Sequence, residues 1–188
     1  MTEPLDYTCE PSSLPHHHPE YVPFGQRGTV QSIPYYAVNQ AVPSNEFGTM
    51  VAVKLTVPAD TMITSMGVAS DLPAGGSAGG TWRAALYSAD EDGLPLAVSG
   101  PWSAPSGVWW KATFYQPLPA ADEARPVLAV IDLGAAAGMT FLVHEPYRPE
   151  LVGARRECYK TADLSTLPVR FTTSQWTFEP RVPLVTLY

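Results

Sequence analysis

The chain has 188 residues, of which 45% are hydrophobic and 15% charged, and its formal net charge at pH 7 is -7. This length suits one domain with an extension, and a domain of this size buries roughly 70% of the surface of its unfolded chain, so that it needs no metal ion or disulfide to hold it together. The acidic balance, with no cluster of Lys and Arg, argues against nucleic-acid binding, because neutralisation of phosphates supplies most of that affinity.

Residues 1–46 form the first segment of the chain, and proline dominates their pattern. Prolines stand at positions 4, 11, 15, 19, 23, 34 and 43. Each removes a backbone donor and biases the preceding residue toward extended geometry. Aromatic residues are spaced between them, and four are expected to act as anchors: Tyr21, Phe24, Tyr35 and Tyr36. We therefore predict an extended arm that docks on the protein's own body or on a neighbouring subunit, where its stiffness lowers the entropy lost on docking.

The sequence shows no signal for export or for membrane insertion. The first ten residues, MTEPLDYTCE, lack the basic and apolar regions of a signal peptide. No apolar run approaches the ~18 residues of a membrane-spanning helix. We therefore expect synthesis in a host cytoplasm, no signal peptide and no membrane insertion.

The body is expected to begin near Phe47 and to run to residue 188 as one domain of short strands. Apolar and polar residues alternate in residues 50–57 and 108–115, which is the period of a half-buried strand. Residues 126–133 are apolar on both faces, as in a central strand, and residues 139–144 are expected to pair back on them as a hairpin. Further strands are predicted at residues 62–70, 81–88, 169–173, 176–178 and 184–188.

The fold class that these strands predict is all-β: a β-sandwich, jelly-roll-like, with an extended Pro-rich N-terminal arm. The 20 prolines and 14 glycines of the chain suit many short strands and oppose long helices. Only residues 149–159 carry a helical period. Eight to ten strands at roughly 10–15-residue spacing are typical of a sandwich.

The two adjacent tryptophans of residues 108–115 must point to opposite faces of their strand. The alternation assigns Trp110 and Phe114 to the core, which leaves Trp109 on the outer face. An exposed tryptophan on a β-face can stack on a sugar ring or fill a subunit interface. We therefore single out Trp109, with Tyr115 and Trp102, as interface or glycan-stacking residues. The alternative is that the arm or a loop covers Trp109.

Two short polar tracts resemble fragments of metal sites. His16 and His18 are the only two of three adjacent histidines that an extended chain can direct at one ion, and a solvated loop explains them better. Residues 90–93 hold two alternating carboxylates before Gly93, but a hairpin turn accounts for them and the distal glutamate of a calcium loop is missing. We expect no metal and no cofactor. Cys9 and Cys158 are interpreted as free or buried thiols, and the alternative is a disulfide that joins the arm to the body, which requires an oxidising compartment.

No set of residues in the sequence predicts catalysis. His144 is the only histidine of the body, and no G-x-S-x-G elbow is present. The acidic residues of the body show no pairing of the kind that glycoside hydrolysis requires. We therefore predict a non-enzymatic protein without catalytic residues.

Residues 81–100, with the sequence TWRAALYSADEDGLPLAVSG, begin a pattern that is followed by GVWWKATFYQPL and RPVLAVIDL. This succession resembles a β-sandwich module of tailed-phage virion proteins and of some bacterial surface proteins, and VPADTMITSMGV at residues 57–68 is similar to the module's opening. The resemblance covers about residues 50–145. It departs from the family at residues 127–130, where Val-Leu-Ala-Val replaces an aromatic-rich segment. Such modules serve as receptor binders, head decorations and tail parts, and the resemblance implies no catalytic residues.

The function expected on this basis is that of a bacteriophage virion structural protein: a head decoration, head spike or tail-fibre component. Its localisation would be the virion and its partners other capsid or tail subunits, reached through the arm. Uncovered sheet edges favour a homo-oligomer, and a trimer is one cyclic form. The alternative is a carbohydrate-binding module that recognises a host-surface glycan or polysaccharide. An enzyme domain, with carboxylates ~5–10 Å apart across a cleft, is a third hypothesis.

Overall fold

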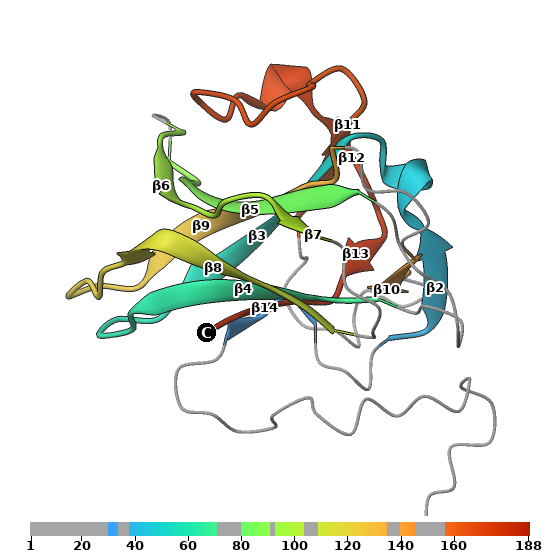
Figure 1. Ribbon diagram of the computed structural model, residues 1–188. Helices are drawn as coiled ribbons and strands as arrows, with labels where there is room; N and C mark the ends of the chain where they lie inside the picture. The colour runs from blue at the N-terminus through green and yellow to red at the C-terminus, as the bar shows by residue number, and fades with distance from the viewer. Residues whose placement is uncertain are drawn as a thin grey trace, which may run out of the picture.

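The computed structural model describes residues 30–33, 38–70, 80–90, 93–103, 109–134, 140–145 and 157–188 (Figure 1). These residues are nearly all β-structure, which confirms the predicted fold class. The strands are β1 (Val30–Gln31), β2 (Gln40–Pro43), β3 (Met50–Val57), β4 (Ile63–Ala69), β5 (Thr81–Ser88), β6 (Pro95–Val98), β7 (Trp102–Ser103), β8 (Trp109–Leu118), β9 (Arg125–Asp132), β10 (Thr140–His144), β11 (Cys158–Thr161), β12 (Thr177–Phe178), β13 (Val182–Pro183) and β14 (Val185–Leu187), with short 3-10 helices η2 (Ser44–Phe47) and η4 (Thr173–Gln175). No helix among them is long and apolar enough to cross a membrane.

The largest sheet has the strand order β12-β11-β3-β9-β5-β6, and β7 also pairs with β5. All of its pairs are antiparallel, and β9 lies between β3 and β5 over its full length. This confirms that residues 126–133 form a central strand. Its residues are buried on both faces, because the core between the layers covers one face and a second apolar cluster packs on the other.

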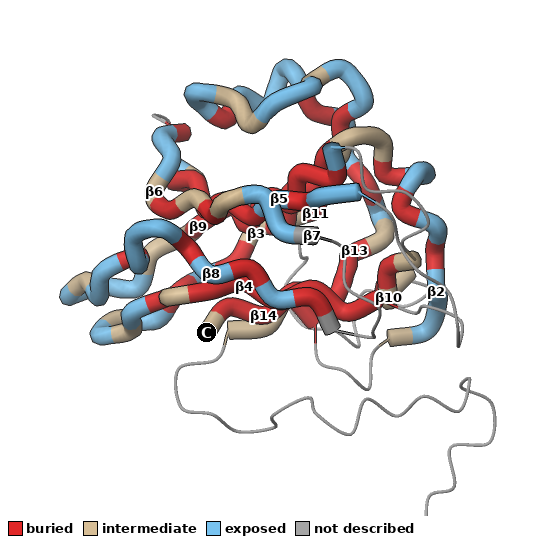
Figure 2. Tube along the Cα trace, viewed as in Figure 1, coloured by how far each residue is buried: buried red, intermediate tan, exposed pale blue. Residues whose placement is uncertain are grey.

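A four-stranded sheet, ordered β1-β14-β4-β8, faces the larger sheet, and β13, β10 and β2 form a third sheet beside them. In Figure 1, β8, β4 and β14 form the layer below β5, β9 and β3. One continuous apolar core fills the space between the layers, with Val53 and Leu55 from the upper sheet and Trp110 and Phe114 from the lower. The predicted alternation of residues 108–115 is therefore confirmed. Figure 2 shows the buried residues running along the strands of both layers.

A second apolar cluster covers the outer face of the larger sheet. Met50, Ala52 and Tyr87 project from the strands, and Phe171 and Trp176 close over them from the segment between β11 and β12. This covering segment, residues 162–176, lies above the sheet in Figure 1. It is fastened by hydrogen bonds from the Tyr87 hydroxyl to the Pro168 carbonyl (2.7 Å) and from the Phe171 amide to the Gly93 carbonyl (2.8 Å).

One predicted strand pairing and one predicted strand are wrong. Residues 139–144 do not return on β9 as a hairpin, because β9 already has partners on both edges; β10 pairs instead with β2 and β13. Residues 169–173 form no strand in the structure. Val169 is 85% exposed while Phe171 is buried in the outer cluster, so that this stretch packs on the sheet through one side chain without joining it.

The sandwich includes residues that the sequence analysis assigned to the arm. β1 pairs with β14, and β2 pairs with β10. Ser32 between them is buried, and its hydroxyl donates to the Pro183 carbonyl at 2.6 Å. The proposed anchors Tyr21, Phe24, Tyr35 and Tyr36 lie outside the described residues.

Candidate functional site

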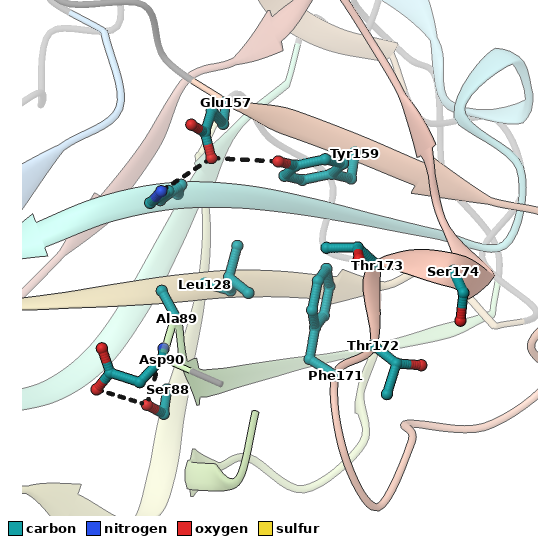
Figure 3. A pocket seen from close by; sticks show the side chains of 11 residues that line it. Ser88, Ala89, Asp90, Leu128, Glu157, Tyr159, Phe171, Thr172, Thr173 and Ser174 are labelled. Carbon is teal, nitrogen blue, oxygen red and sulfur yellow. Dashed lines mark hydrogen bonds and ion pairs between the residues drawn. The ribbon is translucent and has the colours of Figure 1, made fainter. Parts of the chain in front are cut away.

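A cleft of about 440 Å³ lies between the outer face of the larger sheet and residues 171–174 of the covering segment (Figure 3). Two of its lining residues, Lys54 on β3 and Leu128 on β9, have Cα atoms that are paired across the sheet. Lys54 reaches this face because Leu55, its neighbour, points into the core. The same strand therefore supplies both the core and the cleft. The residues that line it are Lys54, Ser88, Ala89, Asp90, Leu128, Glu157, Tyr159, Phe171, Thr172, Thr173 and Ser174.

One wall of the cleft is built on Glu157, which directly precedes β11. Lys54 Nζ lies 2.9 Å from Glu157 Oε2, and the Tyr159 hydroxyl donates to the same oxygen at 3.1 Å. The hydrogen bond from Lys54 holds the pKa of Glu157 below its usual value. Burial, and then the charge of Glu157, raises the pKa of Tyr159. At neutral pH this wall therefore presents an ammonium, a carboxylate and a protonated phenol in one hydrogen-bonded chain.

The opposite wall comes from the end of β5 and the turn that follows it. The Ser88 hydroxyl donates to Asp90 Oδ2 at 3.1 Å and accepts from the Asp90 amide at 3.2 Å. Figure 3 shows Ser88 and Asp90 on one side of Leu128 and Glu157 with Tyr159 on the other. Two carboxylates thus face the cleft from different elements.

The covering segment supplies the third side, which is aromatic at its base and rich in hydroxyls. The Phe171 ring stacks on Trp176 with centroids 4.7 Å apart and meets the Tyr159 ring edge-on at 6.2 Å. Thr172, Thr173 and Ser174 follow Phe171 along the rim. The cleft therefore combines a small apolar base with a ring of donors and acceptors, which is the chemistry of a site for a polar, hydroxyl-bearing ligand.

The stacking residues predicted from the sequence lie elsewhere. Tyr115 on β8 is 75% exposed, and Trp102 on β7 is 41% exposed. They belong to different sheets, although the Tyr115 hydroxyl lies against Gly100, two residues before Trp102. The backbone of Trp109, in β8, pairs with Ala69 of β4, and the Trp109 side chain lies outside the described residues. None of the three residues lines the cleft.

The two tracts that resemble fragments of metal sites lie mostly outside the described residues. His16 to His18 lie outside the described residues, as do Glu91 and Asp92, whereas Asp90 is in the cleft wall. Gly93 has a φ of 53°, in keeping with the predicted turn. Within the described ranges, no three His, Cys, Asp or Glu side chains gather as a metal site requires. Cys158 is a free thiol in the core, where burial raises its pKa, and Cys9 lies outside the description.

Comparison with known proteins adds no family: no family, no curated protein and no solved structure matches the chain. The evidence on function is therefore the geometry itself.

Sequence reasoning missed the cleft because its walls are distant in the chain; Lys54 and Glu157 are 103 residues apart. The one available signal was Lys54, the only charged residue of β3.

Proposed function

We propose that this chain is a non-enzymatic structural protein of a tailed-phage virion, as a head decoration, head spike or tail-fibre component. The stretch that resembles virion modules supports this proposal. Residues 81–100, 107–118 and 125–133 contain strands β5, β6, β8 and β9, which contribute to both layers of the sandwich. The similarity thus includes strands of both layers and the turn between β5 and β6.

The observation that carries the proposal is the attachment of the N-terminal segment to the body. β1 extends the four-stranded sheet beside β14, and β2 joins β10 in another sheet. The Ser32 hydroxyl also accepts from the Val185 amide at 2.8 Å. A segment fastened in two sheets passes to the whole sandwich any force that residues 1–29 exert on neighbouring subunits. This is what an anchoring arm requires.

Deletion of residues 1–29 tests the proposal, because it spares β1 and β2. We expect a folded chain, by circular dichroism and thermal unfolding, that is missing from virions purified from cells expressing it in place of the full chain. Quantitative mass spectrometry of those virions measures the incorporation. A chain lacking residues 1–43 is the control for loss of the two strands and should be destabilised. Full incorporation of the folded 30–188 chain would contradict the arm, and absence of the full chain from virions would contradict the virion proposal.

A second candidate function is carbohydrate binding, which the exposed rings of Tyr115 and Trp102 favour. Large aromatic side chains that stay in solvent are the usual platforms for sugar rings. The test is binding of the full chain to an array of glycans, compared with the double variant Tyr115→Ala/Trp102→Ala. Silence of the full chain across the array would contradict this candidate and leave the virion proposal standing.

A further inference from the structure

We propose that the cleft between Lys54, Glu157 and Asp90 and residues 171–174 is a binding site for a neutral saccharide. This inference rests on the second candidate function, carbohydrate binding. It places the saccharide in the cleft and not on Tyr115 and Trp102. Its support is the convergence of the three walls described above on one cavity. The volume of about 440 Å³ falls in the range of small-molecule sites, roughly 300–1,000 Å³.

The polar groups of the cleft match the hydroxyls of a sugar. Each sugar hydroxyl both donates and accepts, so it requires acceptors and donors in alternation. Glu157 and Asp90 supply charged acceptors on opposite walls, and Lys54 supplies a charged donor between them. Hydrogen bonds to charged groups are stronger than those between neutral groups. The hydroxyls of Thr172, Thr173 and Ser174 extend the same chemistry along the rim.

The apolar base suits the C–H faces of a pyranose ring. Leu128 and Phe171 lie at the base of the cleft, and Tyr159 adds the edge of its ring. A sugar placed there would bury ring carbons against these side chains while its hydroxyls face the polar walls. Such a division between an apolar face and a polar rim distinguishes a saccharide from a simple ion or a purely apolar ligand.

The charges favour a neutral saccharide over an anionic or a cationic one. Among the residues that the structure describes, Lys54 is the only cation that lines the cleft, and its partner at 2.9 Å is Glu157. An anionic sugar would meet both Glu157 and Asp90, and the described lining offers no second cation to balance its charge. An amino sugar would compete with Lys54 for Glu157. A neutral sugar can bond to all three groups without changing their charge.

The site is already organised before a ligand arrives. Lys54 and Tyr159 both hold the same oxygen of Glu157, and Ser88 holds Asp90. Phe171 is fixed from behind by Trp176. Side chains that are ordered in the free protein lose little conformational entropy on binding, which raises the affinity that a few hydrogen bonds can provide.

The test uses the full chain on an array of neutral glucans, mannans, galactans and shorter neutral oligosaccharides, with sialylated and uronic-acid glycans as the charged set. Titration calorimetry with the strongest array ligand then compares Glu157→Gln and Asp90→Asn with Glu123→Gln. Glu123 is exposed between β8 and β9 and does not line the cleft. We expect each cleft variant to bind about tenfold or more weakly, in line with the loss of a charged hydrogen bond, and Glu123→Gln to bind as the native chain does.

The outcomes distinguish the cleft from the surface of Tyr115 and Trp102, and they test the neutral specificity and carbohydrate binding itself. Weakened binding in both cleft variants, with unchanged binding in Tyr115→Ala/Trp102→Ala, supports the cleft. Loss of binding only in Tyr115→Ala/Trp102→Ala overturns the cleft and retains carbohydrate binding. Binding restricted to charged glycans overturns the neutral specificity. No binding by the native full chain overturns both the cleft and the second candidate function.

Discussion

The guanidinium of Arg181 is clamped on the buried carboxylate of Glu179, with Nε 2.8 Å from Oε1 and Nη2 3.2 Å from Oε2. Lys160 Nζ approaches Glu179 Oε2 at 2.7 Å, and Arg181 Nη1 reaches on to Glu46 on η2. The Arg181 guanidinium also lies over the Phe47 ring, 5.0 Å from its centroid. Only 2% of Glu179 is exposed. This network joins the C-terminal region, β11 and the end of the N-terminal segment through one buried charge.

Glu179→Gln is expected to destabilise the fold by about 3 kcal/mol, because removal of one partner of a buried ion pair leaves the others without compensation. Urea unfolding followed by tryptophan fluorescence measures the change in the free energy of unfolding. Glu157→Gln is the matched control: it breaks an ion pair whose side chains are 41% and 43% exposed, and such pairs contribute about 0–1 kcal/mol. Equal losses in the two variants would show that burial of Glu179 does not determine its contribution.

Acidification is expected to weaken the native chain more than the Glu179→Gln variant. Burial alone would raise the pKa of Glu179, but hydrogen bonds from Arg181 and Lys160 outweigh it and hold the pKa below its usual value. A lowered native pKa means that the stabilisation is complete above the unfolded-state value of about 4.3 and is lost as the pH falls below it toward the native pKa. The free energy of unfolding, measured between pH 7 and pH 3, should therefore fall less steeply in the variant. Parallel profiles would contradict this assignment.

The parts of the fold that are predictable from the sequence are those that follow from local alternation. The buried positions of Trp110 and Phe114 follow from the period of β8, and the positive φ of Gly93 follows from its place after an acidic turn. Sheet partners do not follow from such patterns, because a strand's own residues do not specify which edge is vacant. The sequence therefore predicts a pairing of β10 with β9, whereas β10 pairs with β2 and β13.

The cleft and the outer cluster were not predictable for a related reason. The alternation of β3 indicates that Lys54 faces away from the core, but it carries no information on what covers that face. Glu157 reaches Lys54 because β11 pairs with β3, and Phe171 covers the sheet because a long connection folds back. Lys54 and Glu157 are 103 residues apart, and Phe171 packs on Tyr87, which lies on a distant strand, so both contacts depend on the packing of the whole chain.

Phe171→Ala is expected to destabilise the protein by about 3 kcal/mol, as truncation of a buried aromatic side chain leaves a cavity. The variant should also loosen the covering segment, because Phe171 contacts the Trp176 and Tyr159 rings that hold this segment on the sheet. Hydrogen exchange should rise over residues 162–176 before it rises in β3 or β9. Val169→Ala, two residues away and exposed, is the control and should change the stability by less than about 0.5 kcal/mol. Uniform exchange across the sheet would contradict a locally attached segment.

Alanine variants of Gly93 and Gly134 distinguish the cost of backbone strain from the cost of a steric clash. Both have a positive φ, 53° and 44°, which costs a residue with a side chain about 1 kcal/mol or more. A Cβ at Gly93 would lie 2.2 Å from the Phe171 carbonyl oxygen, whereas the nearest atom to a Cβ at Gly134 is 3.5 Å away. Gly93→Ala is therefore expected to lose clearly more stability than Gly134→Ala, and to raise hydrogen exchange at Phe171, whose amide donates to the Gly93 carbonyl. Thermal unfolding of the two variants in parallel makes the comparison, and an equal shift in Tm would show that the turn and the covering segment are not in contact.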